Sequence, residues 1–123
     1  MAVEIEADVG KNRIFIRIAG QLDDADAPAV GDAVIRAMDR MRPGFALISD
    51  LTQAEPMGPL GVEQLKRVIT ASRERKVGQT IRIVGRAAQA ALQFARTSKE
   101  YRHEPYLAFS REEAERLLDG LLP

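Results

Sequence analysis

The chain has 123 residues, 46% of them hydrophobic, which suits one domain with a buried core. It has no cysteine and one histidine, which excludes disulfides, thiol nucleophiles, thiolate metal sites and multi-histidine metal sites. Its apolar runs are far shorter than the roughly 20 residues of a membrane-spanning helix, and the acidic start does not resemble a secretory signal. We therefore expect a single cytoplasmic domain over residues 1–123, with no membrane insertion.

Two segments near the N-terminus alternate between apolar and polar residues. Residues 3–8 place apolar side chains at every second position, and residues 13–19 do the same with Ile14, Ile16 and Ile18. This period of two is typical of strands with one wet face. The turn residues between the segments predict an antiparallel hairpin.

The remainder of the chain alternates helical and strand patterns. In order, we expect a helix from about residues 24–27 to 41, a strand at 45–50, a helix at 59–77, a strand at 80–84, a helix at 87–101, a strand at 106–109 and a helix after Ser110. The order β-β-α-β-α-β-α-β-α predicts an α/β domain. Its centre would be a mixed, mostly parallel sheet with about four helices packed against it.

Spacing and terminal residues add detail to three of these helices. Three carboxylates, Asp23, Asp24 and Asp26, are expected to cap the first helix, and Gly78 is expected to end the second in the usual position of a C-terminal glycine. The expected inward-facing residues are Val30, Val34, Ala37, Met38 and Met41 in the first helix, Leu65, Val68, Ile69 and Ser72 in the second, and Ala114, Leu117, Leu118 and Leu121 in the last.

Charge is unevenly distributed although the net charge is zero. Residues 1–61 carry ten acidic and six basic side chains, whereas residues 66–102 carry ten basic and two acidic ones. This asymmetry suits an acidic partner or a homodimer that pairs the two regions, and it also suits ordinary solvated helix faces. Nucleic-acid binding is disfavoured because the chain has no tryptophan and few aromatic side chains to stack on bases.

Motifs for catalysis or cofactor binding are absent from the sequence. There is no glycine-rich phosphate loop, and one histidine with no nucleophile-elbow sequence does not support a catalytic triad. We therefore predict a non-enzymatic protein with no cofactor and no metal site. In parallel sheets, binding surfaces lie beyond the carboxyl ends of the strands, which directs attention to residues 51–58.

The element order and several short motifs together resemble the STAS domain, the fold of anti-sigma-factor antagonists. The motifs are the hairpin, the segments 20–23 and 47–52, and the turn at 57–61. In regulatory members of that family the loop before the second helix reads Met-Asp-Ser-Ser-Gly, and one serine is phosphorylated. Aligned on Met57 and Gly61, the acceptor position falls on Pro59, which has no hydroxyl.

The resemblance implies a regulatory protein-interaction module whose partner is a protein, such as a kinase-like or other regulatory protein. The expected partner-binding residues are Thr52, Gln53, Glu55, Met57, Gly58, Pro59, Leu60 and Gly61. An alternative is a carrier of small apolar ligands or lipids, similar to CRAL-TRIO domains. Its pocket would be lined by Met38, Met41, Met57, Phe94 and Phe109, although such residues more often fill a core.

Overall fold

A computed structural model describes residues 2–84 and 106–121 of the chain. Its elements are β1 (Ala2–Asp8), β2 (Arg13–Gly20), α1 (Ala27–Asp39), β3 (Ala46–Ala54), α2 (Pro59–Glu74), β4 (Gln79–Ile83), β5 (Tyr106–Ala108) and α4 (Arg111–Leu121). The helix expected at residues 87–101 lies outside the described residues, which therefore contain three helices. The α/β prediction is confirmed.

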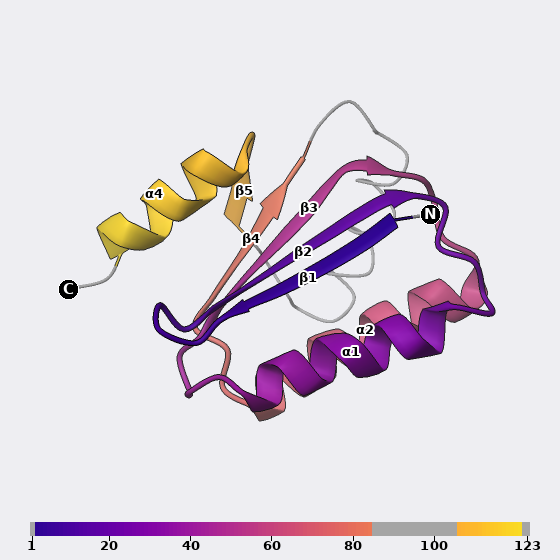
Figure 1. The fold of residues 1–123 in the computed structure, drawn as a ribbon, viewed down its shortest axis with the longest axis horizontal. Helices are drawn as coiled ribbons and strands as arrows, with labels where there is room; N and C mark the ends of the chain where they lie inside the picture. The colour runs from indigo at the N-terminus through magenta and orange to yellow at the C-terminus, as the bar shows by residue number, and fades with distance from the viewer. Residues whose placement is uncertain (1, 85–105, 122–123) are drawn as a thin grey trace.

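The five strands form one mixed sheet in the order β1-β2-β3-β4-β5 (Figure 1). β1 and β2 pair antiparallel, with Ile5 opposite Ile16, so the predicted hairpin is confirmed. The other three pairs of neighbouring strands are parallel: β2 with β3, β3 with β4, and β4 with β5. Because the spatial order follows the chain order, crossovers of one hand place α1 and α2 on the same face of the sheet.

The two faces of the sheet have separate apolar cores. The larger core lies under α1 and α2 and includes Ile14, Ile16 and Leu47. The smaller core includes Phe15, Ile48 and Ile81 and is covered by α4, on the opposite side of the sheet in Figure 1. The alternation of side chains along β2 and β3 supplies both cores from the same strands.

β3 is longer than the sequence pattern predicts. The apolar run ends at Ile48, yet the strand continues to Ala54 because Gln53 and Ala54 stay paired with the last residues of β2. Leu51 and Ala54 are buried in the larger core. The predicted loop at 51–58 is therefore reduced to residues 55–58, and the polar residues Thr52 and Gln53 belong to the strand.

The end of α2 differs from the prediction that Gly78 terminates it. The helix ends at Glu74, and Lys76 adopts the left-handed conformation with φ 59°. Gly78 serves another purpose, since a Cβ there would lie 2.5 Å from the backbone oxygen of Gly44. The glycine lets the turn before β4 pack directly on the turn before β3.

The inward stripes of the helices are largely as predicted, with one error. In α1, Val34, Ala37 and Met38 are buried; in α2, Ile69 and Ser72 are buried; Val30, Met41, Leu65 and Val68 are partly buried. In α4, Ala114 and Leu118 are buried as predicted, and Leu117 is 38% exposed, so the prediction that it is buried is wrong. The side chain of Leu121 lies outside those that the structure describes.

Candidate functional site

The eight residues expected to bind a partner lie in the last part of β3, in the loop after it and in the first turn of α2. The structure divides them by exposure. Gln53, Glu55, Pro59 and Leu60 are exposed, Thr52 and Gly58 are half-buried, and Met57 and Gly61 are buried. A Cβ on Gly61 would lie 2.8 Å from the Cβ of Met57, so the glycine allows the Met57 side chain to fold beneath the helix start. Met57 and Gly61 therefore shape this surface from below.

A second loop, which links β2 to α1, lies against this segment. The backbone N–H of Glu55 donates to the carbonyl of Gly20 at 3.0 Å. The N–H of Leu60, in the first turn of α2, donates to Oδ1 of Asp24 at 3.3 Å. We name residues 20–26 and 52–63 together the edge surface, because both segments meet at the carboxyl edge of the sheet.

Asp24 has a role that the sequence pattern does not indicate. The sequence predicts that it caps α1. The N-cap residue of α1 is Asp26, and no side chain makes a capping hydrogen bond there. Asp24 instead accepts a hydrogen bond from the first turn of α2. The N-cap residue of α2 is Gly58, which has no side chain to serve as a cap. A carboxylate at that end also interacts favourably with the helix dipole.

Replacing Asp24 with Ala should lower the free energy of unfolding by about 1 kcal/mol, the usual cost of losing a helix N-cap. Replacing it with Asn keeps an oxygen acceptor and removes only the charge, so the loss should be about half as large. Urea denaturation followed by circular dichroism measures both. Equal losses for the two variants would show that charge, and not the hydrogen bond, is what matters at this position.

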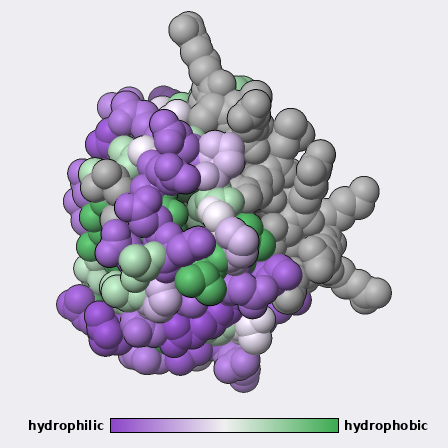
Figure 2. All heavy atoms as spheres, turned by 90° about the vertical axis from the view of Figure 1, so that its right-hand side faces the viewer, coloured by the Kyte–Doolittle hydropathy of each residue, from purple (hydrophilic) through white to green (hydrophobic). Residues whose placement is uncertain are grey.

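The edge surface is acidic and has an apolar residue within it. Its two segments contain five carboxylates, Asp23, Asp24, Asp26, Glu55 and Glu63, and no lysine or arginine. Two cations from outside the segments reach it, Arg17 at Gln53 and Lys66 at Glu63. Leu60 is 46% exposed in the first turn of α2. Figure 2 views the molecule from this side, where hydrophilic side chains predominate and a few hydrophobic ones reach the surface. Such a surface is complementary to a basic partner with an apolar contact.

Thr52 is already engaged within the chain. Its hydroxyl donates to Oδ1 of Asp50 at 2.7 Å, and its backbone N–H donates to the same oxygen at 3.0 Å. The two bonds hold the end of β3 in place beside Gln53, whose Oε1 accepts from Arg17 at 3.1 Å. Thr52 thus contributes to the rigidity of the strand that carries the edge surface.

An apolar cavity of about 80 Å³ lies between the sheet and the two helices α1 and α2. Ile16, Leu47, Met57 and Leu65 are among its lining residues. Pockets that hold drug-sized ligands measure roughly 300–1,000 Å³, so this cavity is too small for a lipid.

The other residues of the proposed carrier pocket are scattered. Met38 is buried in the core, Met41 is partly buried against it, Phe109 is 79% exposed, and Phe94 lies outside the described residues. Met57 is the one methionine of this set that lines the cavity. The described residues therefore do not assemble these side chains into one pocket.

Arg82 lies at the polar side of that cavity, near Ser49, Ser72 and Thr80. It is 6% exposed, and burial lowers the pKa of its guanidinium to about 10. The group therefore remains protonated at neutral pH. Ser72 donates its hydroxyl hydrogen to the carbonyl of Ile69 at 2.7 Å and so satisfies its polar atom within α2.

Residues 2–84 and 106–121 contain neither a metal-binding group of side chains nor a membrane-spanning helix. No group of three or more metal-ligating side chains is arranged to hold a metal ion in this part of the chain. No helix in the same ranges is both long enough and apolar enough to cross a bilayer.

Comparison with known proteins identifies the fold. No protein-family model and no curated protein matches the sequence. Among solved structures, the unphosphorylated anti-sigma factor antagonist SpoIIAA matches with a TM-score of 0.65 and 17% identity, over 98% of this chain and 97% of that chain.

Two further structures agree. An anti-sigma factor antagonist from Mycobacterium paratuberculosis has a TM-score of 0.63 and 17% identity, over 96% of this chain and 93% of its own. An uncharacterized protein of the DUF3478 family from Shewanella loihica PV-4, described as having a SpoIIAA-like fold, has a TM-score of 0.67 and 13% identity, over 95% and 92%. This chain therefore has the STAS-like fold of the anti-sigma-factor antagonists.

Proposed function

We propose that this chain is a non-catalytic regulatory module that binds a protein partner through the edge surface. The observation that carries the proposal is Leu60, a large apolar side chain 46% exposed on a surface whose two segments carry five carboxylates and no basic residue. Exposed apolar groups surrounded by charge are typical of protein contact sites. The partner would offer a socket for Leu60 and basic side chains around it.

The proposed contact residues are the exposed members of the predicted set, Gln53, Glu55, Pro59 and Leu60, together with the half-buried Thr52 and Gly58. Met57 and Gly61 would support them from below. Two structural neighbours are named anti-sigma factor antagonists, a name that describes action on another protein, which supports a partner of that kind. Fold likeness alone does not assign function, so the surface chemistry carries the argument.

Phosphorylation at the family's acceptor position is not part of this proposal, because that position is Pro59. A side chain on Gly58 is also disfavoured, since a Cβ there would lie 2.6 Å from Oδ1 of Asp24. Asp24 already places a carboxylate at the start of α2. The module would therefore present a constant negative charge near Pro59, the position to which the STAS resemblance assigns the phosphorylated serine.

The test is a pull-down from native lysate with matched arginine variants. Leu60→Arg places a cation on the edge surface, whereas Leu117→Arg makes the same change on α4, where Leu117 is 38% exposed. The wild type and Leu117→Arg should recover the same specific protein, and Leu60→Arg should lose it. With that protein purified, Leu60→Arg should raise Kd more than tenfold, or about 1.4 kcal/mol.

A charge-neutral pair tests the acidic component separately. Glu55→Gln/Glu63→Gln should weaken binding and flatten its dependence on salt, because fewer charge pairs remain to be screened. Equal recovery by Leu60→Arg and the wild type would contradict the proposal. Recovery of no protein, together with a small molecule that copurifies, would favour the carrier instead. If the protein recovered is a second copy of this chain, the edge surface mediates a homodimer.

A further inference from the structure

Helix α4 has a small apolar contact with the sheet. Of its described side chains, Ala114 and Leu118 are buried, and Leu117 is 38% exposed. Beneath them the sheet presents Phe15, Ala46, Ile48, Ile81, Ile83 and Ala108, which form the smaller core. Among the described residues, α4 therefore contributes two fully buried apolar side chains to its contact with the sheet, and its polar contacts matter correspondingly more.

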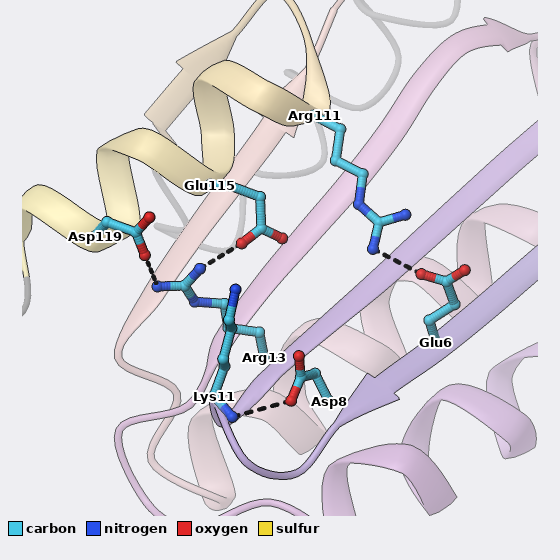
Figure 3. Close-up of polar contacts among 7 residues, drawn as sticks. All are labelled: Glu6, Asp8, Lys11, Arg13, Arg111, Glu115 and Asp119. Atoms are coloured by element: carbon cyan, nitrogen blue, oxygen red, sulfur yellow. Dashed lines mark hydrogen bonds and ion pairs between the residues drawn. The ribbon is translucent and has the colours of Figure 1, made fainter.

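A charged stripe on α4 supplies a second attachment. Arg111, Glu115 and Asp119 are spaced four residues apart and so lie on one face of the helix. Figure 3 shows all three side chains directed toward the N-terminal hairpin. Arg13 of β2 donates to Glu115 and, at 2.6 Å, to Asp119, so one guanidinium joins two turns of the helix.

Arg111 makes the third link. Its guanidinium donates to Glu6 of β1 at 2.6 Å and lies 3.9 Å above the ring of Phe15, in a cation–π contact. Glu6 and Phe15 are on the same face of the hairpin as Arg13, since residues two apart on a strand share a face. The hairpin thus holds α4 at both ends of its charged stripe.

Arg13 makes this attachment decisive, because its side chain is only 5% exposed. Burial lowers the pKa of Arg13, but its hydrogen bonds to Asp119 and Glu115 and their negative charges raise it by more. The same hydrogen bond from Arg13 holds the pKa of Asp119 below its ordinary value. A buried guanidinium that loses its carboxylates is strongly unfavourable.

α4 is not expected to persist as a helix away from the sheet. It has 11 residues, and isolated helices of this length are marginal in water. Gly120 within it weakens the helix further. The capping bond from the N–H of Glu113 to the hydroxyl of Ser110 helps to start the helix but does not hold it on the sheet. Docking and folding of α4 are therefore coupled.

We propose that α4 is a latch, which Arg13 of β2 holds on the sheet through its ion pairs with Glu115 and Asp119. When these ion pairs are weakened, the whole helix is released from the sheet. Release uncovers the apolar strip of Ile48, Ile81 and Ile83 on a sheet that α1 and α2 still support from the other side. The latch is independent of the edge surface, which lies at the carboxyl ends of β2 and β3. It adds a second conformational state to the module.

Hydrogen–deuterium exchange of the full chain tests the latch. The variant Glu115→Gln/Asp119→Asn removes both charges from side chains that are partly or largely exposed, so it should still fold. Amide exchange in residues 111–121 should accelerate more than tenfold, with α1, α2 and β3 unchanged. Binding of the dye ANS should rise in parallel, because the apolar strip becomes accessible.

The matched control is Glu4→Gln/Arg17→Gln. Arg17 lies on the same strand and face as Arg13, but it pairs with Glu4 at 3.9 Å and with Gln53. This variant should leave exchange in α4 unchanged. Faster exchange in α4 of the control variant would overturn the proposal. So would a test variant in which α1 and α2 accelerate as much as α4, or one in which exchange in α4 does not change.

Salt supplies a test without mutation. Raising NaCl from 0.1 to 1 M shortens the screening length from about 10 Å to about 3 Å. Exchange in residues 111–121 of the wild type should then accelerate, whereas the Glu115→Gln/Asp119→Asn variant should change less, because only its Arg111–Glu6 pair remains to be screened. Asp119, Arg111 and Glu6 are exposed enough to be screened, so α4 exchange in the wild type that is insensitive to salt would count against these pairs as the latch.

Discussion

Replacing Ile48 with Ala should lower the free energy of unfolding by about 3–4 kcal/mol, within the range for truncating a fully buried isoleucine. Ile48 is 0% exposed and lies on β3, the middle strand of the sheet. The register places it between Phe15 of β2 and Ile81 of β4. Those neighbours are held by strand pairing and cannot close the space left by the lost side chain.

Urea denaturation monitored by circular dichroism measures this effect, with two variants for comparison. Ile48→Val removes one methylene and should cost about 0.5–1.5 kcal/mol. Val9→Ala, in the exposed turn after β1, should cost less than about 0.5 kcal/mol. A loss below about 1 kcal/mol for Ile48→Ala would mean that α4 settles into the vacated space, and that the core beneath it is loosely packed.

Replacing Gly78 with Ala should have the second largest effect, a loss of about 2–3 kcal/mol from overpacking. The added Cβ would lie 2.5 Å from the oxygen and 2.9 Å from the carbon of the Gly44 carbonyl. Two backbone hydrogen bonds fix that approach: Gly44 N–H donates to Lys76 and Gly78 N–H donates to Phe45, each at 2.7 Å. Relief of the clash would require at least one of these bonds to lengthen.

Gly120→Ala is the matched control, because a Cβ there meets no atom within 4 Å. Gly120 lies within α4, where alanine is the better helix former, so this variant should gain about 0.5–1 kcal/mol. Thermal denaturation should therefore shift the two alanine variants in opposite directions. A Gly78→Ala protein as stable as the wild type would show that the two turns separate at little cost.

The edge surface and the latch place two kinds of behaviour on opposite parts of one sheet. The edge surface depends on exposed side chains of α2 and two loops, which a substitution such as Leu60→Arg alters without touching the core. The latch depends on Arg13, a buried cation that links the first strands to the last helix. Variants of the two regions can therefore be read separately, binding from one and exchange from the other.

Local pattern was sufficient to predict the order and type of the described elements, although not where β3 and α2 end. The alternation of Ile14, Ile16 and Ile18 reflects the two-residue period of a strand, and the structure confirms both the hairpin and the face that these residues share. Pro59 after Gly58 marked the start of α2 correctly. Such signals reside in a few consecutive residues, because backbone geometry and side-chain periodicity are local properties.

The contacts that give the molecule its particular surface were decided by tertiary structure. Asp24 caps α2 rather than α1, Gly78 accommodates Gly44 rather than ending a helix, and Leu117 faces solvent. Arg13 meets Asp119 across 106 residues of chain. Periodicity tells which face of an element is apolar, but not which distant side chain will lie opposite it. That depends on the order of strands and the angle of each helix, which form only when the whole sheet assembles.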